Sequence, residues 1–178
     1  ILCDDMDIDV RELISLANKH PRVDILNPGC GVGGHCISVD PWFIVDSANG
    51  KAKMIEQARR TNDYKADWVV EKIKEQALIF EKECGRRAAI SCMGLAFKPD
   101  IDDLRESPAL YIAQELNKVL DIVAVEPNIQ EHKKLKLVNL EDGVMSDICV
   151  YLVFHSEFIN IDLNKWDLDF CGISEACL

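Results

Sequence analysis

The amino-acid sequence predicts an α/β protein in which a helical segment with a long spine helix precedes a domain built on a parallel sheet. Residues 52–84 keep a helical pattern of apolar and charged residues without interruption. After Gly85, short apolar runs alternate with helical stretches, and this order favours parallel strands joined by right-handed crossovers. We therefore place a domain boundary near residue 85, with one unit over 1–85 and a second over 86–178.

Shorter elements are expected before the long helix. The spacing of apolar residues predicts a helix over residues 8–19, capped by Asp9 and ended before Pro21. Pro41 is expected to open another short helix. The first residues resemble the tail of a helix already in progress, so we expect the chain to be a fragment of a longer protein. The side chains predicted to form the buried face of the helix over residues 8–19 are Ile8, Leu13, Leu16 and Ala17.

The long helix is expected to run from Ala52 to about Cys84, with Gly85 as its C-cap. About thirty helical residues extend about 45 Å, which suits a connection between domains or a dimer interface. The polar run 59–63 is expected to form a solvated face or salt links between domains. The apolar residues that define the helical pattern are Met54, Ile55, Ala58, Trp68, Val69, Ile73, Ala77, Leu78 and Phe80.

The second unit is expected to contain four strands and a well-defined helix. The helix has Pro108 in its first turn, where the missing N–H of proline costs nothing. Strands are predicted at 88–94, 121–127, 147–154 and 166–172, the helix at 106–119, and a partly helical stretch at 130–138.

Composition limits the classes of function. The 178 residues are 48% apolar, which is enough to bury a core, and the net charge of −11 repels nucleic acid and anionic membranes. No run approaches the length of a membrane-spanning helix, and the acidic first residues do not resemble a secretory signal. We therefore expect a cytoplasmic protein with no nucleic-acid or membrane partner.

The chain has eight cysteines, which we expect to be reduced thiols because no secretory signal is present. No C-x-x-C motif occurs. Cys30 and Cys36 are unusual because glycines surround them. Six others stand singly in mostly apolar surroundings and are expected to pack as small apolar residues: Cys3, Cys84, Cys92, Cys149, Cys171 and Cys177.

The sequence NPGCGVGGHCISVDPWF, residues 27–43, admits several interpretations. Its glycines satisfy the letters of the dinucleotide fingerprint G-x-G-x-x-G, but Pro28 stands where a strand should end and Pro41 where a helix should be under way. A zinc site would use Cys30, His35, Cys36 and Asp40 as ligands. It is disfavoured because the side chains of two adjacent residues, His35 and Cys36, are hard to direct at one tetrahedral ion. We predict no metal.

Two interpretations of the same loop stay open. One is a structural glycine turn in which Cys36 is buried and inert. The other is a bed of bare backbone that lets a substrate approach a reactive thiol closely, with Cys36 as nucleophile. Asp40, four residues on, lies on the same side if the segment turns helically, and its carboxylate can orient a water for hydrolysis.

Two motifs, GVGGHCISVDPWF and GLAFKPDIDDLRESPA, resemble the UDP-glucose/UDP-N-acetylmannosamine 6-dehydrogenase family of nucleotide-sugar enzymes. The GGHC-x-x-VDP form is most similar to the branch that acts on UDP-N-acetylmannosamine and related acetamido sugars. The resemblance implies a central helical domain that forms a homodimer through its long helix, followed by a Rossmann-like UDP-binding domain. It also implies NAD as cofactor and a UDP-sugar as substrate, with the NAD domain upstream of this chain, so the chain alone is expected to be inactive.

By this resemblance, Cys36 captures the intermediate aldehyde as a thiohemiacetal that is then oxidised to a thioester, and Asp40 assists its hydrolysis. The family's supporting lysine and asparagine lie upstream of the first residue. Cys30 departs from the family, which usually has proline or another small residue there. A UDP-glucose 6-dehydrogenase and a non-catalytic nucleotide-binding or dimerisation module are the alternative functions.

The resemblance also assigns binding residues. Phe97 and Lys98 are expected to contact the UDP-sugar, and Arg22 is expected to enter the substrate site of the partner subunit. Arg105 is expected to meet the NAD phosphates, although an ion pair with a neighbouring acid is an alternative for it. Asn62 is a weaker candidate near the active site. Gly33 and Gly34 are expected to let the sugar ring pass over the backbone.

Overall fold

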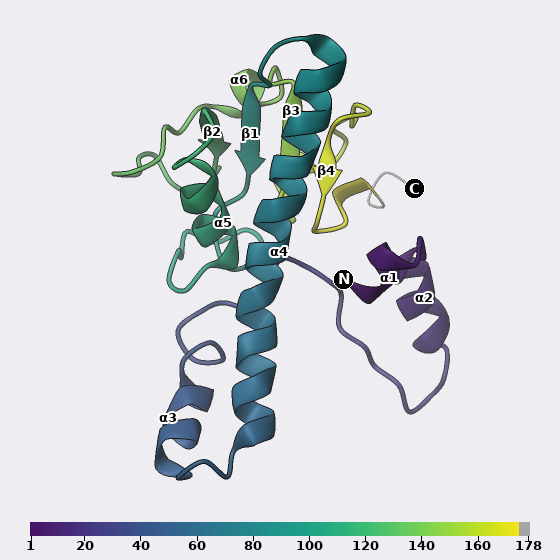
Figure 1. Cartoon of the computed structure of the whole chain (residues 1–178), viewed down its shortest axis with the longest axis vertical. Helices are drawn as coiled ribbons and strands as arrows, with labels where there is room; N and C mark the ends of the chain where they lie inside the picture. Colours follow the sequence, from purple (N-terminus) through teal and green to yellow (C-terminus); the bar gives the residue numbers. More distant parts are fainter. Residues whose placement is uncertain (175–178) are drawn as a thin grey trace.

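A computed structural model of the chain describes residues 1–174, and the predicted packing of Cys177 lies outside them. Figure 1 shows one helix, α4, running through most of the molecule. The sheet lies beside the C-terminal half of α4, α3 lies beside its N-terminal half, and α1 and α2 form a separate arm. The bounds are α1 Leu2–Asp5, α2 Val10–Ala17, α3 Asp40–Ser47, α4 Lys53–Cys84, α5 Pro108–Leu116, α6 Leu140–Gly143 and a 3-10 turn over Ser156–Phe158.

The local signals at the helix ends act as predicted. Asp9 caps α2 by accepting hydrogen bonds from the backbone N–H groups of Arg11 and Glu12. Helix α4 has 32 residues and is capped by Gly85, whose φ of 69° is the left-handed conformation that glycine adopts most readily. Pro108 lies in the first turn of α5 as predicted, and Ser107, which was not predicted as a cap, caps that helix. The caps at Asp9 and Gly85 are short-range interactions, so the sequence predicts them well.

The sheet has the order β2-β1-β3-β4, and all its pairs are parallel. Strands β1 Ile90–Met93, β2 Ile122–Val125, β3 Ile148–Tyr151 and β4 Leu168–Asp169 fall within the four predicted ranges. Because β2 lies on one side of β1 and β3 on the other, the chain changes direction between β1 and β3. Open parallel sheets bind ligands at the carboxyl end of such a switch point.

Both faces of the sheet are covered, as a parallel sheet requires. Alternate strand residues face α4 and α5 in one cluster, which includes Ile73, Ile90 and Ile112. The intervening residues, such as Met93 and Tyr151, pack in a second cluster with Leu140 of α6 and Phe158. The C-terminal half of α4 thus shares its core with the sheet. None of the helices over residues 1–174 combines the length and the apolar character needed to cross a membrane.

The predicted apolar stripe of the first helix is wrong. Ile14 is the buried residue of α2, whereas Leu13 is 41% exposed and Leu16 is 56% exposed. Ile8 is also exposed. The helix instead turns inward the face that holds Ile14 and Arg11, toward the end of the sheet. A salt bridge of 3.8 Å between Arg11 and Asp169 joins it there.

Three other sequence predictions need correction. Residues 130–138 form no helix and instead run in irregular backbone with a single bridge from Leu137 to Ala124, since β2 offers them an open edge. Cys84 is exposed on the last turn of α4, beyond the sheet, and does not pack as an apolar residue. In the polar run of α4, Arg59 is buried and pairs with Asp63 at 3.2 Å. On the same helix Ala58, Met54 and Leu78 are exposed.

Candidate functional site

The glycine loop lies across α4 and is held there by one side chain. The carbonyl oxygen of the Asn62 amide accepts the backbone N–H of Val32 at 2.7 Å, and its NH2 group donates to the Val32 carbonyl at 3.3 Å. Asn62 lies in the N-terminal half of α4, so this pair of bonds positions the loop against a rigid element. The structure therefore gives Asn62 a supporting role in the loop that contains Cys36.

Gly33 and Gly34 lie against the second unit of the chain. A Cβ added to Gly33 would be 2.3 Å from the backbone oxygen of Glu106 and 2.8 Å from Cδ of Pro108. A Cβ on Gly34, whose φ is 93°, would be 2.9 Å from the ring of Phe97. The space beside the two glycines is therefore filled by the chain itself. Their lack of side chains brings the thiol loop into contact with the loop of Phe97.

Cys36 and Asp40 share one helical turn, as the sequence predicts. The backbone N–H of Asp40 donates to the Cys36 carbonyl at 2.7 Å, and Ser38 donates its hydroxyl to the Gly34 carbonyl. Asp40 is the first residue of α3. The Cys36 thiol is exposed, with its sulfur 3.8 Å from Nδ1 of His35. An exposed thiol is accessible to a substrate, so the alternative in which Cys36 is buried is wrong, and its reactivity stays a prediction.

A charged pair lies next to this thiol. Nε and Nη2 of Arg105 donate to the carboxylate of Asp103, at 3.0 and 2.6 Å. These bonds lower the pKa of Asp103 to about 2, and Asp103 in turn raises the pKa of Arg105. Cys36 is close enough to Arg105 to add to that rise, and the Arg105 carbonyl accepts the N–H of Gly34 at 3.2 Å. The alternative ion pair predicted for Arg105 is therefore present, beside the thiol loop.

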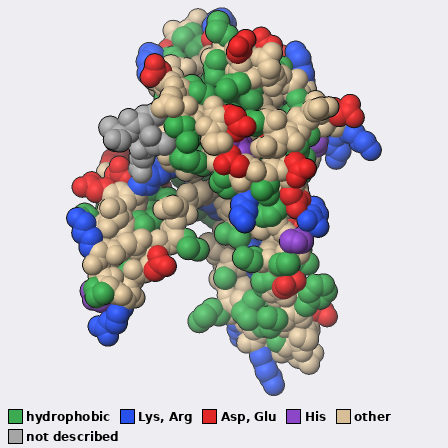
Figure 2. Space-filling model, turned by 180° about the vertical axis from the view of Figure 1, so that it is seen from behind, with side chains coloured by type: hydrophobic (Ala, Val, Ile, Leu, Met, Phe, Trp, Pro, Cys, Tyr) green, Lys and Arg blue, Asp and Glu red, His purple; other side chains and the backbone are tan. Residues whose placement is uncertain are grey.

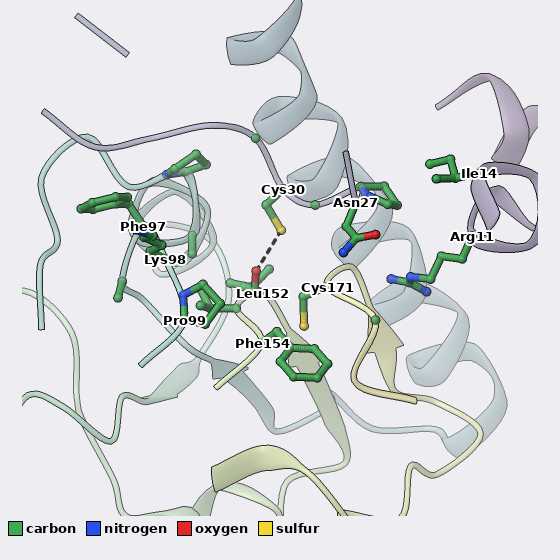
Figure 3. Close-up of a pocket in the computed structure, with 18 of the residues that line it drawn as sticks. Arg11, Ile14, Asn27, Cys30, Phe97, Lys98, Pro99, Leu152, Phe154 and Cys171 are labelled. Atoms are coloured by element: carbon green, nitrogen blue, oxygen red, sulfur yellow. Dashed lines mark hydrogen bonds between the residues drawn. The ribbon is translucent and has the colours of Figure 1, made fainter. Parts of the chain in front are cut away.

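A cavity of about 660 Å³ lies at the carboxyl ends of β1 and β3. Figure 3 shows Phe97 and Lys98 on one side of it and Arg11 and Ile14 on the other, with Cys30 between them. Figure 2 shows the molecule hollowed between the α1–α2 arm and the N-terminal half of α4. The cavity has the place and the size of a ligand site in an open parallel sheet.

The two cysteines of the glycine loop have different environments. Cys30 is buried, and its thiol donates to the Leu152 carbonyl at 3.5 Å (Figure 3). Burial raises the pKa of Cys30 to about 12, so it remains a protonated thiol. Within residues 1–174, Cys30 does not form a metal-ligand cluster with exposed His35, Cys36 and Asp40.

The structure brings most of the predicted site residues to one region. Phe97 and Lys98 line the cavity, and the ring of Phe97 lies against the glycine loop that leads to Cys36. Arg22 is exposed in the loop after α2, outside the cavity lining described over residues 1–174. Sequence reasoning missed Arg11, which lines the cavity from α2. No local motif marks that residue, since it resembles an ordinary charge on a helix surface.

The fold and the motifs correspond to those of known proteins. The central-domain model of the UDP-glucose/GDP-mannose dehydrogenase family matches residues 1–64, and the UDP-binding-domain model of that family matches residues 91–169. A UDP-N-acetyl-D-mannosamine dehydrogenase of Campylobacter jejuni is 51% identical over 93% of this chain and 42% of its own length. An NDP-N-acetyl-D-galactosaminuronic acid dehydrogenase of Ralstonia solanacearum is 44% identical over 93% of this chain and 40% of its own length.

Solved structures show the same fold. The UDP-D-ManNAc dehydrogenase of Pyrococcus horikoshii superposes with a TM-score of 0.81 at 30% identity, covering 97% of this chain and 42% of that one. A UDP-glucose dehydrogenase of Pyrobaculum islandicum has a TM-score of 0.80 at 19% identity, over 97% of this chain and 42% of that one, which is a likeness of fold alone. The chain spans about two fifths of the length of these relatives. It belongs to the UDP-glucose/GDP-mannose dehydrogenase family and contains the family's central domain and UDP-binding domain.

Proposed function

We propose that the protein containing this chain oxidises the C6 alcohol of a UDP-N-acetylamino sugar, of the N-acetylmannosamine type, to a carboxylate. The observation that supports this most strongly is the exposed thiol of Cys36 on a glycine loop in direct contact with Phe97, beside the cavity of the UDP-binding domain. The N-acetylated sugars named for the relatives at 51% and 44% identity favour an acetamido sugar over glucose.

The substrate's nucleotide is proposed to occupy the cavity at the sheet's carboxyl edge. A UDP group has two negative charges on its diphosphate, and the chain's net charge is −11, so binding needs local cations. Lys98 provides one on the cavity wall, beside Phe97. In the proposed dimer, Arg22 of each subunit reaches the site of the other.

In the proposed chemistry, the sulfur of Cys36 bonds to the carbon of the C6 aldehyde, and the carbonyl oxygen takes up a proton to give a thiohemiacetal. Loss of a hydride and a proton converts this adduct into a thioester. Asp40 accepts a proton from a water whose oxygen attacks the thioester carbon, and the sulfur leaves as the carboxylate forms. Both groups lie on one exposed turn, at the start of α3.

The proposed cofactor is NAD, which when bound accepts the hydride in each oxidation. In this chain, Arg105 fits the phosphates of NAD. The carbonyl of Arg105 accepts the N–H of Gly34 in the thiol loop, and only Nε and Nη2 of its guanidinium bond to Asp103 within residues 1–174. Its Nη1 edge can therefore face a phosphate. The G-x-G-x-x-G letters of the loop follow no strand, so they do not form a dinucleotide site.

The proposal is tested by turnover of the full-length protein. With UDP-N-acetylmannosamine and NAD, we expect two NADH per sugar and a uronate product, measured by absorbance and mass spectrometry. Faster turnover of UDP-glucose would instead support the alternative dehydrogenase. Binding of UDP with no oxidation of either sugar would support the non-catalytic module.

Lys98→Ala should weaken the binding of UDP by the full-length protein at least tenfold. The reason is the loss of a charge-assisted bond to phosphate, which is worth about 1.5–3 kcal/mol. Isothermal calorimetry measures the affinity. Lys51→Ala is the matched control, since Lys51 is an exposed lysine outside the cavity lining over residues 1–174. Equal affinities in the wild type and Lys98→Ala would contradict the assignment.

The full-length protein should sediment as a homodimer. The exposed apolar side chains of the central segment, including Phe43 at 69% and Leu16 at 56%, leave surface that a second subunit can cover. Analytical ultracentrifugation over a range of concentrations measures the mass. A monomer at the highest concentration would contradict this part of the proposal and remove the role of Arg22 in a neighbouring site.

A further inference from the structure

A buried carboxylate, Glu126, lies directly after β2, close to the cavity. Its side chain has no exposed surface. Oε2 accepts the backbone N–H groups of Leu95 and Ala96 at 2.7 and 2.9 Å. Oε1 accepts the N–H of Asn128 at 3.2 Å. A buried charge is tolerated only with such partners, so the position of this group is closely determined by the loops around it.

His155 completes the arrangement from the loop after β3. It is fully buried, and its Nε2 lies 3.1 Å from Oε2 of Glu126. Its Nδ1 accepts the backbone N–H of Asp100 at 3.0 Å, so Nε2 carries the ring proton and donates it to Glu126. Burial alone raises the pKa of Glu126, but the bonds from His155 and the N–H of Leu95 outweigh it and hold the pKa below its usual value.

These bonds join the loops that follow three strands. Leu95 and Ala96 follow β1, Glu126 follows β2, and His155 follows β3. Ser107 adds a further tie by donating its hydroxyl to the Leu95 carbonyl at 2.6 Å. In the loop after β1, just before Phe97 and Lys98, the N–H groups of Leu95 and Ala96 are therefore bonded to Glu126. The carbonyl of Leu95 is bonded to Ser107.

In dinucleotide-binding folds, an acidic residue at the end of the second strand binds the ribose of the ligand. Glu126 stands at that position, yet its carboxylate faces the chain's own backbone and no solvent. It is therefore not a ribose ligand in this structure. Its partners lie in the loop that forms one wall of the cavity, which includes Ala96, Phe97, Lys98 and Pro99.

We propose that Glu126, oriented by His155, is a positioning residue that sets Phe97 and Lys98 in place for the nucleotide. The proposal rests on the proposed function, since it takes the cavity as the UDP site. The negative charge matters as well as the shape, because one oxygen accepts two backbone N–H groups and the imidazole N–H together. A neutral amide of the same size has only one oxygen and presents two N–H groups where acceptors are needed.

The test compares Glu126→Gln with the wild type in the full-length protein. We expect the affinity for UDP, measured by calorimetry, to fall about tenfold, and KM for the UDP-sugar to rise by a similar factor. The kcat at saturating substrate should stay within about twofold, because Cys36 and Asp40 are unchanged. Hydrogen exchange should accelerate at the amides of Leu95 and Ala96. Glu141→Gln, an exposed acid on α6, is the control and should match the wild type.

If Glu126→Gln does not fold, Asn128→Ala serves as a milder variant, because the Asn128 side chain contacts Oε1 of Glu126 at 3.4 Å from an exposed position. It should shift the UDP affinity and the Leu95 exchange rate in the same direction by a smaller factor. Unchanged UDP affinity in a folded variant would overturn the inference while leaving the proposed function intact. Lack of UDP binding by the wild type would instead reject the UDP site itself.

Discussion

Cys36→Ala should lower the turnover of the UDP-sugar by the full-length protein by about three orders of magnitude or more. The thiol is the only group in the proposed mechanism that can hold the aldehyde covalently, and removal of a nucleophile from a catalytic unit commonly costs that much. UDP affinity should be unchanged, because Cys36 is not among the residues that line the cavity over 1–174. NADH formation and calorimetry measure the two quantities separately.

Cys84→Ala is the matched control, since Cys84 is an exposed thiol at the C-terminal end of α4, whereas the glycine loop of Cys36 contacts the N-terminal half of that helix. Its turnover should equal that of the wild type. In the wild type, iodoacetamide should label Cys36 faster than Cys84, because the proposed role of Cys36 as nucleophile requires a thiol that reacts readily. Retained activity in Cys36→Ala, or equal labelling of the two thiols, would contradict the role of Cys36 as nucleophile.

Gly33→Ala should both destabilise the protein and lower kcat/KM about a hundredfold. The added Cβ meets the backbone oxygen of Glu106 and the ring of Pro108, and neither can rotate away. Overpacking of this kind costs about 1–3 kcal/mol, and a displacement of about 1 Å in a catalytic loop can cost a hundredfold in rate. The melting temperature should fall by several degrees. Calorimetry and steady-state kinetics check both effects.

Gly29→Ala provides the control for this substitution. Gly29 belongs to the same loop, but a Cβ there has no neighbouring atom within 4 Å, and its φ is not in the left-handed region. The control should keep the melting temperature of the wild type, and only stability is compared because Gly29 lines the cavity. A Gly33→Ala protein with wild-type behaviour would show that the thiol loop does not need its close contact with Glu106 and Phe97.

Much of the secondary structure could be predicted because it depends on neighbouring residues. Asp9 and Ser107 bond to N–H groups within three residues of themselves, and Gly85 ends α4 by its own backbone preference. The turn that joins Cys36 to Asp40 is equally local, so the sequence indicates both residues and their spacing. The resemblance to a known family then supplies their proposed roles.

Predictions of burial were less successful, because burial depends on contacts between distant segments. An apolar stripe on the first helix predicts a buried face, but Leu13 and Leu16 stay exposed among the described residues 1–174. Cys84 follows the apolar pattern of α4, yet the helix extends past the sheet before it ends. An apolar pattern therefore does not guarantee burial, since much of the surface of a folded protein is apolar.

The sequence by itself determined the four parallel strands, the helices α2 to α5 in their order, the caps of α2 and α4, and the paired motifs around Cys36 and Lys98. Only the tertiary structure decided that Asn62 holds the glycine loop and that Phe97 fills the space beside Gly34. The tertiary structure also decided that Cys30 is buried while Cys36 is exposed. It also placed Glu126 beneath the loop of Lys98. The physical reason is distance along the chain: these contacts join residues about thirty or more positions apart, which no local pattern of apolar and polar residues specifies.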